Sequence, residues 1–383
     1  MKKTIFLAAI ACVALAGCTK NEKIADNGRD VANVPLAFNP LASPATKTVY
    51  GEIPAAYNIN EQFVAFAGWT EAVYNTTAPT DLFPAAGITC AHDATLYAWK
   101  PTTVYYWPKT GYLTFEAYSP AVASTYATHT WAAGIGFNDF AVPATIATQY
   151  DLMISNREFD KKRGDYTITD AGHGNAYDDE DDATYKYNGV NLMFNHILSS
   201  IRFLVKTKAD YSTNAQFTLT GLTIDNAYSV GDFAEGVTTA APAASFARNM
   251  AWSGQETEVN YTVVTGGSQA VVYNGGTALP LTNDPDIILL PQALAHGTNN
   301  VTVTVNYTVA QNGGAAIPQT AVIKLKDLTE SSSGSATAVT EWQLGKRYTY
   351  TIVFGLEEIY FDPAVADWTD VTMDEYEIKE SDI

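Results

Sequence analysis

The chain has 383 residues, of which 47% are hydrophobic and 16% are charged, a composition that excludes an intrinsically disordered acidic tail. Its length exceeds what one compact core accommodates, so we expect two domains. The 22 basic and 41 acidic residues leave a net charge of −19, which repels phosphate backbones and argues against nucleic acid as a partner.

The first 18 residues have the pattern of an export signal. Lys2 and Lys3 precede an apolar run over residues 4–15, which is shorter than the roughly 20 residues that a membrane-spanning helix needs. The run closes on Leu15-Ala16-Gly17-Cys18, which resembles the lipobox of bacterial lipoproteins. This resemblance implies that the Cys18 thiol is acylated and that the mature chain starts there, anchored by lipid. The alternative is an ordinary secretory signal with an incidental cysteine.

Residues 19–33 are polar and poor in aromatic side chains, which is typical of a flexible tether. Of the three cysteines, Cys12 leaves with the signal peptide and Cys18 carries lipid, so Cys90 has no cysteine partner in the mature chain. The fold must therefore be held by its core and by strand pairing, without an internal disulfide.

From residue 34 onward, short runs of alternating aromatic or β-branched and small polar residues are separated by Gly, Pro, Asn and Asp. This pattern predicts an all-β protein. In the first half, the expected strands cover residues 34–38, 62–69, 96–99, 112–118, 139–142 and 151–154. The pattern is lost in a charged stretch over residues 161–187, so we place a domain boundary at residue 187.

In the second half, residues 190–194 and 201–206 predict two strands joined by a short turn or helical segment. Residues 287–290 are apolar on both faces, so we expect a strand buried centrally in a sheet. The other expected strands cover residues 217–224, 259–264, 301–309, 321–325 and 348–356. This spacing of strands predicts one β-sandwich domain at residues 34–187 and a second at residues 188–383.

Several blocks, taken together and in this order, resemble the fimbrillin family of lipoprotein pilins, whose subunits form type V pili. The blocks are Tyr106-Trp107-Pro108 with Phe115-Glu116-Ala117-Tyr118, Asp151-Leu152-Met153, Phe194-Asn195-His196 with Ile201-Arg202-Phe203, Leu290-Pro291-Gln292, and residues 342–350 followed by Ile359 and Asp367-Trp368. The resemblance implies two tandem transthyretin-like β-sandwich domains and delivery to the outer membrane as a lipoprotein. It leaves open whether the subunit belongs to the stalk, the tip or the anchor of a pilus.

The same resemblance implies that an Arg- or Lys-specific protease removes the N-terminal segment with its first strand, and that a terminal strand of another subunit fills the groove. Two cleavage points fit, Arg29 and Lys47. We expect cleavage at Lys47, because only a cut beyond residues 34–38 frees that strand. Residues 40–46 contain two prolines among small residues, which favours an extended segment that a protease can bind.

The C-terminal residues 369–383 are a candidate donor strand. Val371 and Met373 alternate with polar residues, and Tyr376 and Ile378 continue the spacing after a slip of one residue. The alternative is a frayed acidic terminus, since six carboxylates accompany the single Lys379.

No catalytic, cofactor or metal site is predicted. The five histidines show none of the spacings of zinc sites, and nucleophile elbows and phosphate-binding glycine loops are absent from the sequence. We expect His196 to be a packed, hydrogen-bonded histidine. The acidic run 178–182 reads as a solvated loop, and Arg163-Gly164-Asp165 is the tripeptide that integrins bind, which a hydrophilic loop would expose to a host receptor. We therefore expect a protein that is not an enzyme.

A surface glycan-binding lipoprotein is the main alternative to a pilus subunit. Trp69, Trp99, Trp107 and Trp131 fall in the first half among many tyrosines, and exposed aromatic rings of this kind stack on sugars. The competing interpretation is that they fill the core of a β-sandwich and its rims. Coplanar, exposed rings in one cleft would favour glycan binding.

Overall fold

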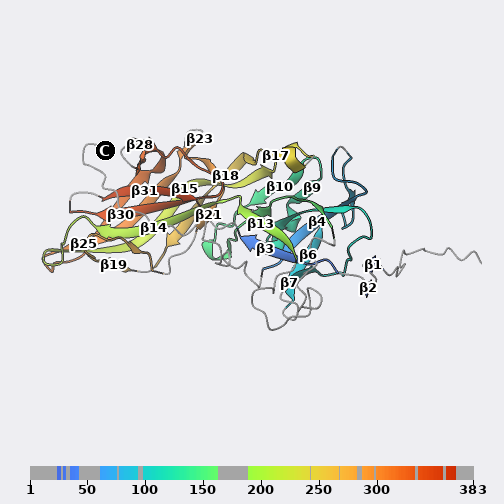
Figure 1. Cartoon of the computed structure of the whole chain (residues 1–383). Helices are drawn as coiled ribbons and strands as arrows, with labels where there is room; N and C mark the ends of the chain where they lie inside the picture. The colour runs from blue at the N-terminus through green and yellow to red at the C-terminus, as the bar shows by residue number, and fades with distance from the viewer. Residues whose placement is uncertain are drawn as a thin grey trace, which may run out of the picture.

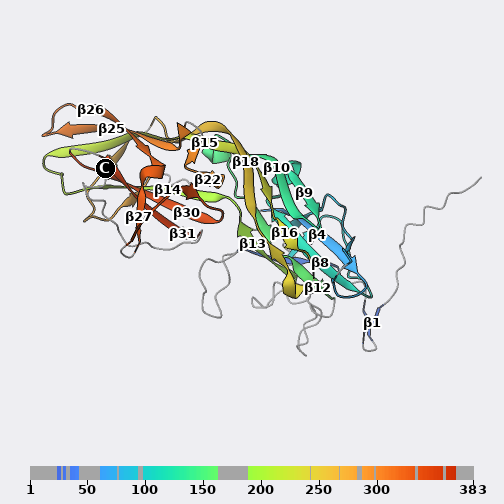
Figure 2. The same cartoon turned by 90° about the horizontal axis from the view of Figure 1, so that it is seen from above.

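The computed structural model describes residues 24–26, 29–31, 35–42, 61–75, 77–93, 98–162, 189–241, 243–266, 268–282, 287–296, 299–332, 335–356 and 359–367. The described chain is built almost entirely of strands, which confirms the all-β prediction, and it forms an elongated molecule (Figures 1 and 2). Its helical elements are short 3-10 turns, at Ala121–Thr125, Ile146–Thr148, Ala243–Ser245 and Leu325–Asp327. Over the described ranges, none of the helices has the length and apolarity to cross a bilayer.

The largest sheet lies in the first half of the chain and has the strand order β12-β8-β11-β13-β3-β7-β6-β4-β5. Because β8 also pairs with β4, seven of these strands close into a ring. Buried side chains of β3, β4, β8 and β13 share one core cluster. The strand bounds are β3 Phe38–Ala42, β4 Phe63–Thr70, β5 Thr80–Asp81, β6 Ile88–Asp93, β7 Ala98–Pro101, β8 Tyr112–Ser119, β11 Met153–Ser155, β12 Glu158–Lys161 and β13 Val190–His196.

A second sheet is organised around β15, a strand of 20 residues. Residues 215–225 of β15 pair with β25, and residues 230–234 pair with β10, so one strand belongs to both halves of the molecule. β18 and β19 pair with β15 as well. The bounds are β9 Ala127–Thr130, β10 Gly134–Ala141, β15 Ala215–Ala234, β18 Ala251–Val264, β19 Gln269–Val271, β25 Thr302–Gln311 and β26 Ile317–Lys324.

A third sheet, of five strands, lies in the second half, with β14 and β30 parallel and β31 antiparallel to β30. Residues 287–289 form β21, which is fully buried as expected but pairs with β14 at one side of the sheet. Its burial comes from packing on both faces. The bounds are β14 Ser199–Thr207, β20 Leu279–Pro280, β21 Ile287–Leu289, β30 Lys346–Phe354 and β31 Ile359–Asp367.

Short two-stranded ribbons complete the described strands. They are β1 Ile24–Asp26 with β2 Arg29–Val31, β16 Val237–Thr239 with β17 Ala247–Arg248, β22 Gln292–Ala293 with β29 Glu341–Trp342, β23 Ala295–His296 with β24 Asn299–Asn300, and β27 Thr329–Ser332 with β28 Ser335–Ala338.

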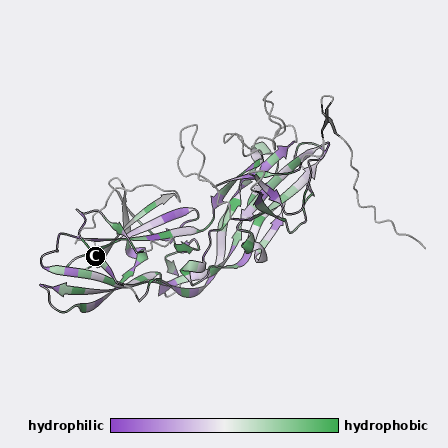
Figure 3. Cartoon of the chain, turned by 90° about the horizontal axis from the view of Figure 1, so that it is seen from below, coloured by the Kyte–Doolittle hydropathy of each residue, from purple (hydrophilic) through white to green (hydrophobic). Residues whose placement is uncertain are grey.

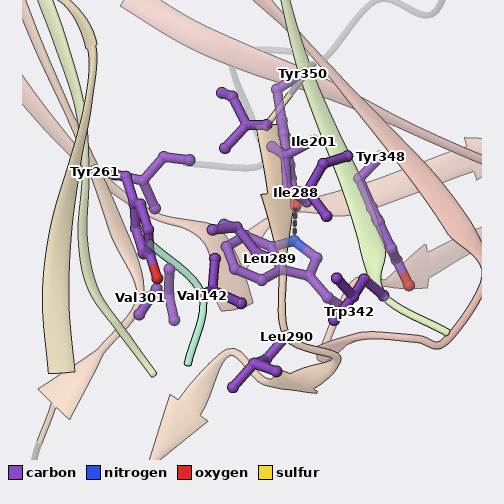
Figure 4. Packing of buried hydrophobic residues seen from close by; sticks show 14 of the residues in the cluster. Val142, Ile201, Tyr261, Ile288, Leu289, Leu290, Val301, Trp342, Tyr348 and Tyr350 are labelled. Carbon is purple, nitrogen blue, oxygen red and sulfur yellow. Dashed lines mark hydrogen bonds between the residues drawn. The ribbon is translucent and has the colours of Figure 1, made fainter. Parts of the chain in front are cut away.

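The core joins the sheets through alternating apolar residues, which Figure 3 displays as green segments between purple and white ones along the strands. In the second half, side chains of β14, β15 and β30 pack together, and the indole N–H of Trp342 donates to Tyr350 Oη at 3.0 Å (Figure 4). In the first half, the face of β8 that carries Tyr118 packs on Phe137 of β10, with ring centroids 5.4 Å apart. One wall of the ring is thus covered by a second layer.

The position of β13 differs from the expectation that residues 190–194 open the second domain. β13 pairs with β11 and β3 and so belongs to the sheet of the first half, while β14, which follows directly, belongs to the five-stranded sheet. The charged stretch before residue 187 suggested a boundary, but the apolar side of β13 completes the first core: Val190, Leu192 and Phe194 are all buried.

Candidate strand-exchange site

The first strand of the ring, β3, is held unequally by its two neighbours. It pairs with β13 in parallel over five residues, from Phe38 opposite Val190 to Ala42 opposite Phe194. With β7, on its other side, the pairing of the described residues is limited to Phe38 opposite Trp99. Over the described residues, the ring therefore closes through a single residue pair between β3 and β7.

The strand lies later in the sequence than the expected residues 34–38. Residues 35 and 36 approach the neighbouring loop instead: Pro35 makes an isolated bridge to Tyr106, and the Leu36 N–H donates to the Tyr105 carbonyl at 2.7 Å. The regular strand thus begins at Phe38.

The main apolar contribution of β3 is Phe38, which has no exposed surface. Its ring meets Phe63, Phe83 and Phe115 edge to face, at centroid distances of 5.8, 6.4 and 5.5 Å. Burying a phenylalanine contributes about 1.5–3 kcal/mol, and each aromatic pair adds about 0.5–1.5 kcal/mol. The burial of Phe38 thus contributes more to holding β3 on the core than the pairing with β7 does.

The backbone of β3 comes unusually close to β13 at Gly189. A Cβ placed on Gly189 would lie 2.4 to 2.6 Å from backbone atoms of Phe38, so a glycine is needed there. Next to it, the Val190 N–H donates to the Ala37 carbonyl at 2.9 Å. On the outer face, Asn39 Nδ2 donates to Asn191 Oδ1 at 2.8 Å.

Of the residues predicted for lipid anchoring, processing and strand donation, the structure describes only Arg29. Cys18, Lys47 and the tail 369–383 lie outside the described residues, as do the acidic run 178–182 and the tripeptide 163–165. Arg29 is the first residue of β2, opposite Asp26 of β1. Nothing in the described structure joins Arg29 to β3.

His196, the histidine singled out in the sequence, makes a structural contact. His196 Nδ1 lies 2.6 Å from Asp151 Oδ2, as expected for a hydrogen-bonded histidine, and both side chains are partly buried. Within the part of the chain that the structure describes, no three His, Cys, Asp or Glu side chains come together as a metal site would require.

Three of the four tryptophans considered for glycan binding are core residues. Trp99, Trp107 and Trp131 are at most 6% exposed, so they cannot form an exposed platform. Trp69 differs, because it is half-buried and lines an open cavity. The interpretation that these tryptophans fill the core of a β-sandwich is therefore confirmed for three of the four.

A buried charge cluster under β8 has no signature in the sequence. Glu116 is fully buried and accepts hydrogen bonds from Arg157 Nε at 2.9 Å and Nη2 at 2.8 Å, while His129 Nε2 lies 2.6 Å from its Oε1. Burial alone raises the pKa of Glu116, but the contact with His129 and the charge of Arg157 outweigh it and lower that pKa below its ordinary value. Arg157 also donates to the Trp131 carbonyl at 3.0 Å.

A second buried carboxylate lies beside this cluster. Glu235 accepts a hydrogen bond from the Ile135 N–H at 2.8 Å and pairs with Arg248 Nη1 at 3.0 Å. Burial, and then the negative charge of Glu116, raise the pKa of Glu235. The partners are 13 to 100 residues apart in the chain, so only the fold brings them together.

A profile of the fimbrillin-like family matches residues 60–368, which is most of the chain. The chain belongs to the fimbrillin-like family. This confirms the resemblance stated from the sequence blocks.

Solved structures give fainter similarity to this fimbrillin-like chain. A fimbrial protein from Bacteroides vulgatus is 16% identical, with a TM-score of 0.44, over 88% of this chain and 100% of that one. The tip fimbrial protein Mfa3 from Porphyromonas gingivalis, truncated at its C-terminus, is 11% identical, with a TM-score of 0.34, over 87% of this chain and 100% of that one. Curated protein sequences gave no match.

Proposed function

We propose that this fimbrillin-like chain is a structural or adhesive subunit of a cell-surface pilus. It reaches the outer membrane as a lipoprotein acylated at Cys18 and acts without catalysis or a cofactor. Membership of the fimbrillin-like family supports the pilus, and the lipobox at residues 15–18 supports the lipid anchor. Its partners are other pilin subunits, together with a host protein or glycan receptor if the subunit is adhesive.

Assembly proceeds by strand exchange at the site of β3. Removal of β3 leaves the edges of β13 and β7 unpaired and exposes an apolar slot lined by Phe63, Phe115 and Phe194. A strand from another subunit then occupies the slot and restores the ladder. The single observation that carries this proposal is the position of β3: it is a member of the ring, yet its ladder to β7 is a single described residue pair.

Cleavage after Lys47 fits this mechanism better than cleavage after Arg29. Lys47 follows Phe38–Ala42, so a cut there separates the whole of β3 from the rest of the chain. A cut after Arg29 leaves β3 covalently attached and only shortens the tether. The donor in this scheme is the tail 369–383 of a neighbouring subunit.

The domain organisation that we propose is two tandem transthyretin-like sandwiches, residues 34–187 and 188–383. The strand pairing adds one refinement, since β13 of the second segment completes the sheet of the first. The five-stranded sheet and the part of β15 that pairs with β25 share the core of the second sandwich.

The decisive experiment compares Lys47→Ala with Arg29→Ala as the matched control. Filaments are isolated from cells, imaged by electron microscopy, and their subunits are sequenced from the N-terminus. We expect Lys47→Ala to abolish filaments while the secreted monomer stays folded, and Arg29→Ala to assemble normally with Thr48 as the first residue. Normal filaments from Lys47→Ala would contradict the assignment of Lys47, and filaments whose subunits retain residues 38–42 would contradict strand exchange at β3.

A further inference from the structure

An open cavity lies in the loop between β4 and β5, in the first half of the molecule. Its volume is about 440 Å³, and the residues lining it include Trp69, Thr70, Glu71, Asn75, Thr77 and Thr80. β4 runs away from the five-stranded sheet, so the loop after it lies toward the far end of the molecule (Figure 2). Ligand pockets commonly have volumes of roughly 300–1,000 Å³, so the cavity has room for a small ligand.

The loop around the cavity is fixed to the body of the protein at several points. The Trp69 indole N–H donates to the Thr110 carbonyl at 2.9 Å, and the Tyr74 N–H donates to Asp160 Oδ1 at 2.7 Å. After the loop, the Leu82 N–H donates to the Ala67 carbonyl at 2.7 Å. A site held in this way needs little ordering when a ligand binds, which favours affinity.

Gly111 allows the indole to take this position. Its φ is +81°, and a Cβ there would lie 2.4 Å from Trp69 Nε1, so a side chain at residue 111 would displace the ring. Trp69 stays half-buried, whereas Trp99, Trp107 and Trp131 are buried in the core. The fold thus leaves the Trp69 indole available at the cavity.

The polar groups of the cavity select the chemical class of ligand. Asn75 offers an amide that donates and accepts, Thr77 and Thr80 offer hydroxyls, and Glu71 offers a carboxylate. Such a set matches a ligand rich in hydroxyl groups that both donate and accept.

Charge excludes the acidic members of that class. The described residues that line the cavity include Glu71 but no lysine, arginine or histidine, and the chain as a whole carries a net charge of −19. A sialylated or sulfated sugar would be repelled. A single carboxylate also gives too few oxygen ligands for a divalent cation.

We propose that this cavity is a binding site for a neutral saccharide, with the Trp69 indole packing against the sugar ring and Asn75, Thr77 and Glu71 exchanging hydrogen bonds with its hydroxyls. The site goes beyond a role in pilus assembly and does not rest on it, because the whole cavity lies within one subunit and apart from β3.

The test uses the mature full-length monomer on an array of neutral hexose and N-acetylhexosamine oligosaccharides, with their sialylated and sulfated counterparts. Calorimetric titration then follows with the best neutral oligosaccharide. Loss of one hydrogen bond in Asn75→Ala should weaken binding by about tenfold, and Trp69→Ala should abolish it. Tyr273→Ala removes an exposed aromatic ring outside the cavity and serves as the matched control, with unchanged affinity.

Thermal unfolding of each variant separates loss of binding from loss of folding. Asn75 is exposed, so its substitution should leave the melting temperature unchanged even if Trp69→Ala lowers it. The site is supported if the parent protein retains neutral oligosaccharides that Asn75→Ala binds more weakly and Trp69→Ala does not bind. No retention of any neutral oligosaccharide, a preference for the sialylated or sulfated forms, or equal binding by Asn75→Ala and the parent overturns it.

Discussion

At the scale of single residues, the charge cluster around Glu116 is a buried ion-pair network. Glu116 and Arg157 are both fully buried, and each supplies most of the other's hydrogen bonds. Removing one member of such a pair leaves the other as an unpaired charge in the interior, which costs more than the pair itself contributes.

Arg157→Ala should therefore lower the free energy of unfolding by about 3–5 kcal/mol. Urea denaturation followed by circular dichroism measures it. Lys100→Ala, which breaks a partly exposed pair with Asp93, is the control and should change stability by about 1 kcal/mol or less. Equal losses in the free energy of unfolding for the two variants would show that the buried pair contributes no more to stability than the partly exposed pair.

The pH dependence of stability follows from the lowered pKa of Glu116. Because the pKa in the folded state lies below the ordinary value of 4.5, the charged carboxylate stabilises the fold above that value. This stabilisation is lost as the pH falls from 4.5 through the lowered pKa. Glu235 has the opposite sign, since its raised pKa means that its contribution is lost as the pH rises above 4.5.

We accordingly expect Glu116→Gln to be less stable than the parent near neutral pH but to lose less stability on acidification. Urea titrations at several values between about pH 6 and pH 3 give the two slopes. In Glu235→Gln, measured alongside, the stability should instead fall less than that of the parent as the pH rises. Parallel pH curves for the parent and Glu116→Gln would contradict the assignment.

These residues also mark the limit of what the sequence predicts. The histidine that was expected to be hydrogen-bonded, His196, is so, because its neighbours in sequence fix its burial. Glu116 and Arg157 are 41 residues apart and look like any other surface charges until β8 and β11 are paired. Among the four tryptophans considered for glycan binding, the half-buried Trp69 could not be distinguished from the three buried ones for the same reason.

At the scale of elements, most of the expected strands are present with small errors at their ends, whereas β6 and β31 were not expected, and two of the larger errors have identifiable causes. β15 was expected to cover only residues 217–224. Asn226 takes a positive φ of 60°, and the register with β18 shifts there, so the strand continues through a bulge to Ala234. β3 was expected too early, since the apolar residues Pro35 and Leu36 contact the loop that holds Tyr105 and Tyr106.

The close approach of β3 to β13 gives a prediction for this element. Gly189→Ala places a methyl group against the Phe38 backbone and should lower stability by about 1–3 kcal/mol, with faster amide exchange in β3. Hydrogen exchange with mass spectrometry follows residues 35–42 directly. Gly231→Ala is the matched control, because its added Cβ meets only ordinary contacts of 3.4 Å or more and its stability should hardly change. Unaltered exchange in β3 of Gly189→Ala would show that the strand is not held by this contact.

At the scale of the whole molecule, the proposed exchange requires a donor as well as an acceptor. A chain truncated after Trp368 lacks residues 369–383 but keeps every described strand through β31, so it should fold with the stability of the parent. We expect it to be unable to extend a filament as a donor, while its own groove still accepts a full-length subunit. Mixing truncated and full-length proteins and measuring filament length by electron microscopy distinguishes these roles. Filaments of normal length from the truncated chain alone would mean that another strand is the donor.

The continuity of β15 has a mechanical consequence for a filament built from this protein. β15 takes part in the ladders to both β10 and β25, and its pairing with β18 spans the bulge between them, so bending the molecule at its middle would have to break backbone hydrogen bonds of that strand. We expect a subunit built in this way to behave as a stiff rod. When a chain of such rods is pulled or bent by flow, the deformation concentrates at the joints between subunits, and the persistence length of the fibre is then set by the joints.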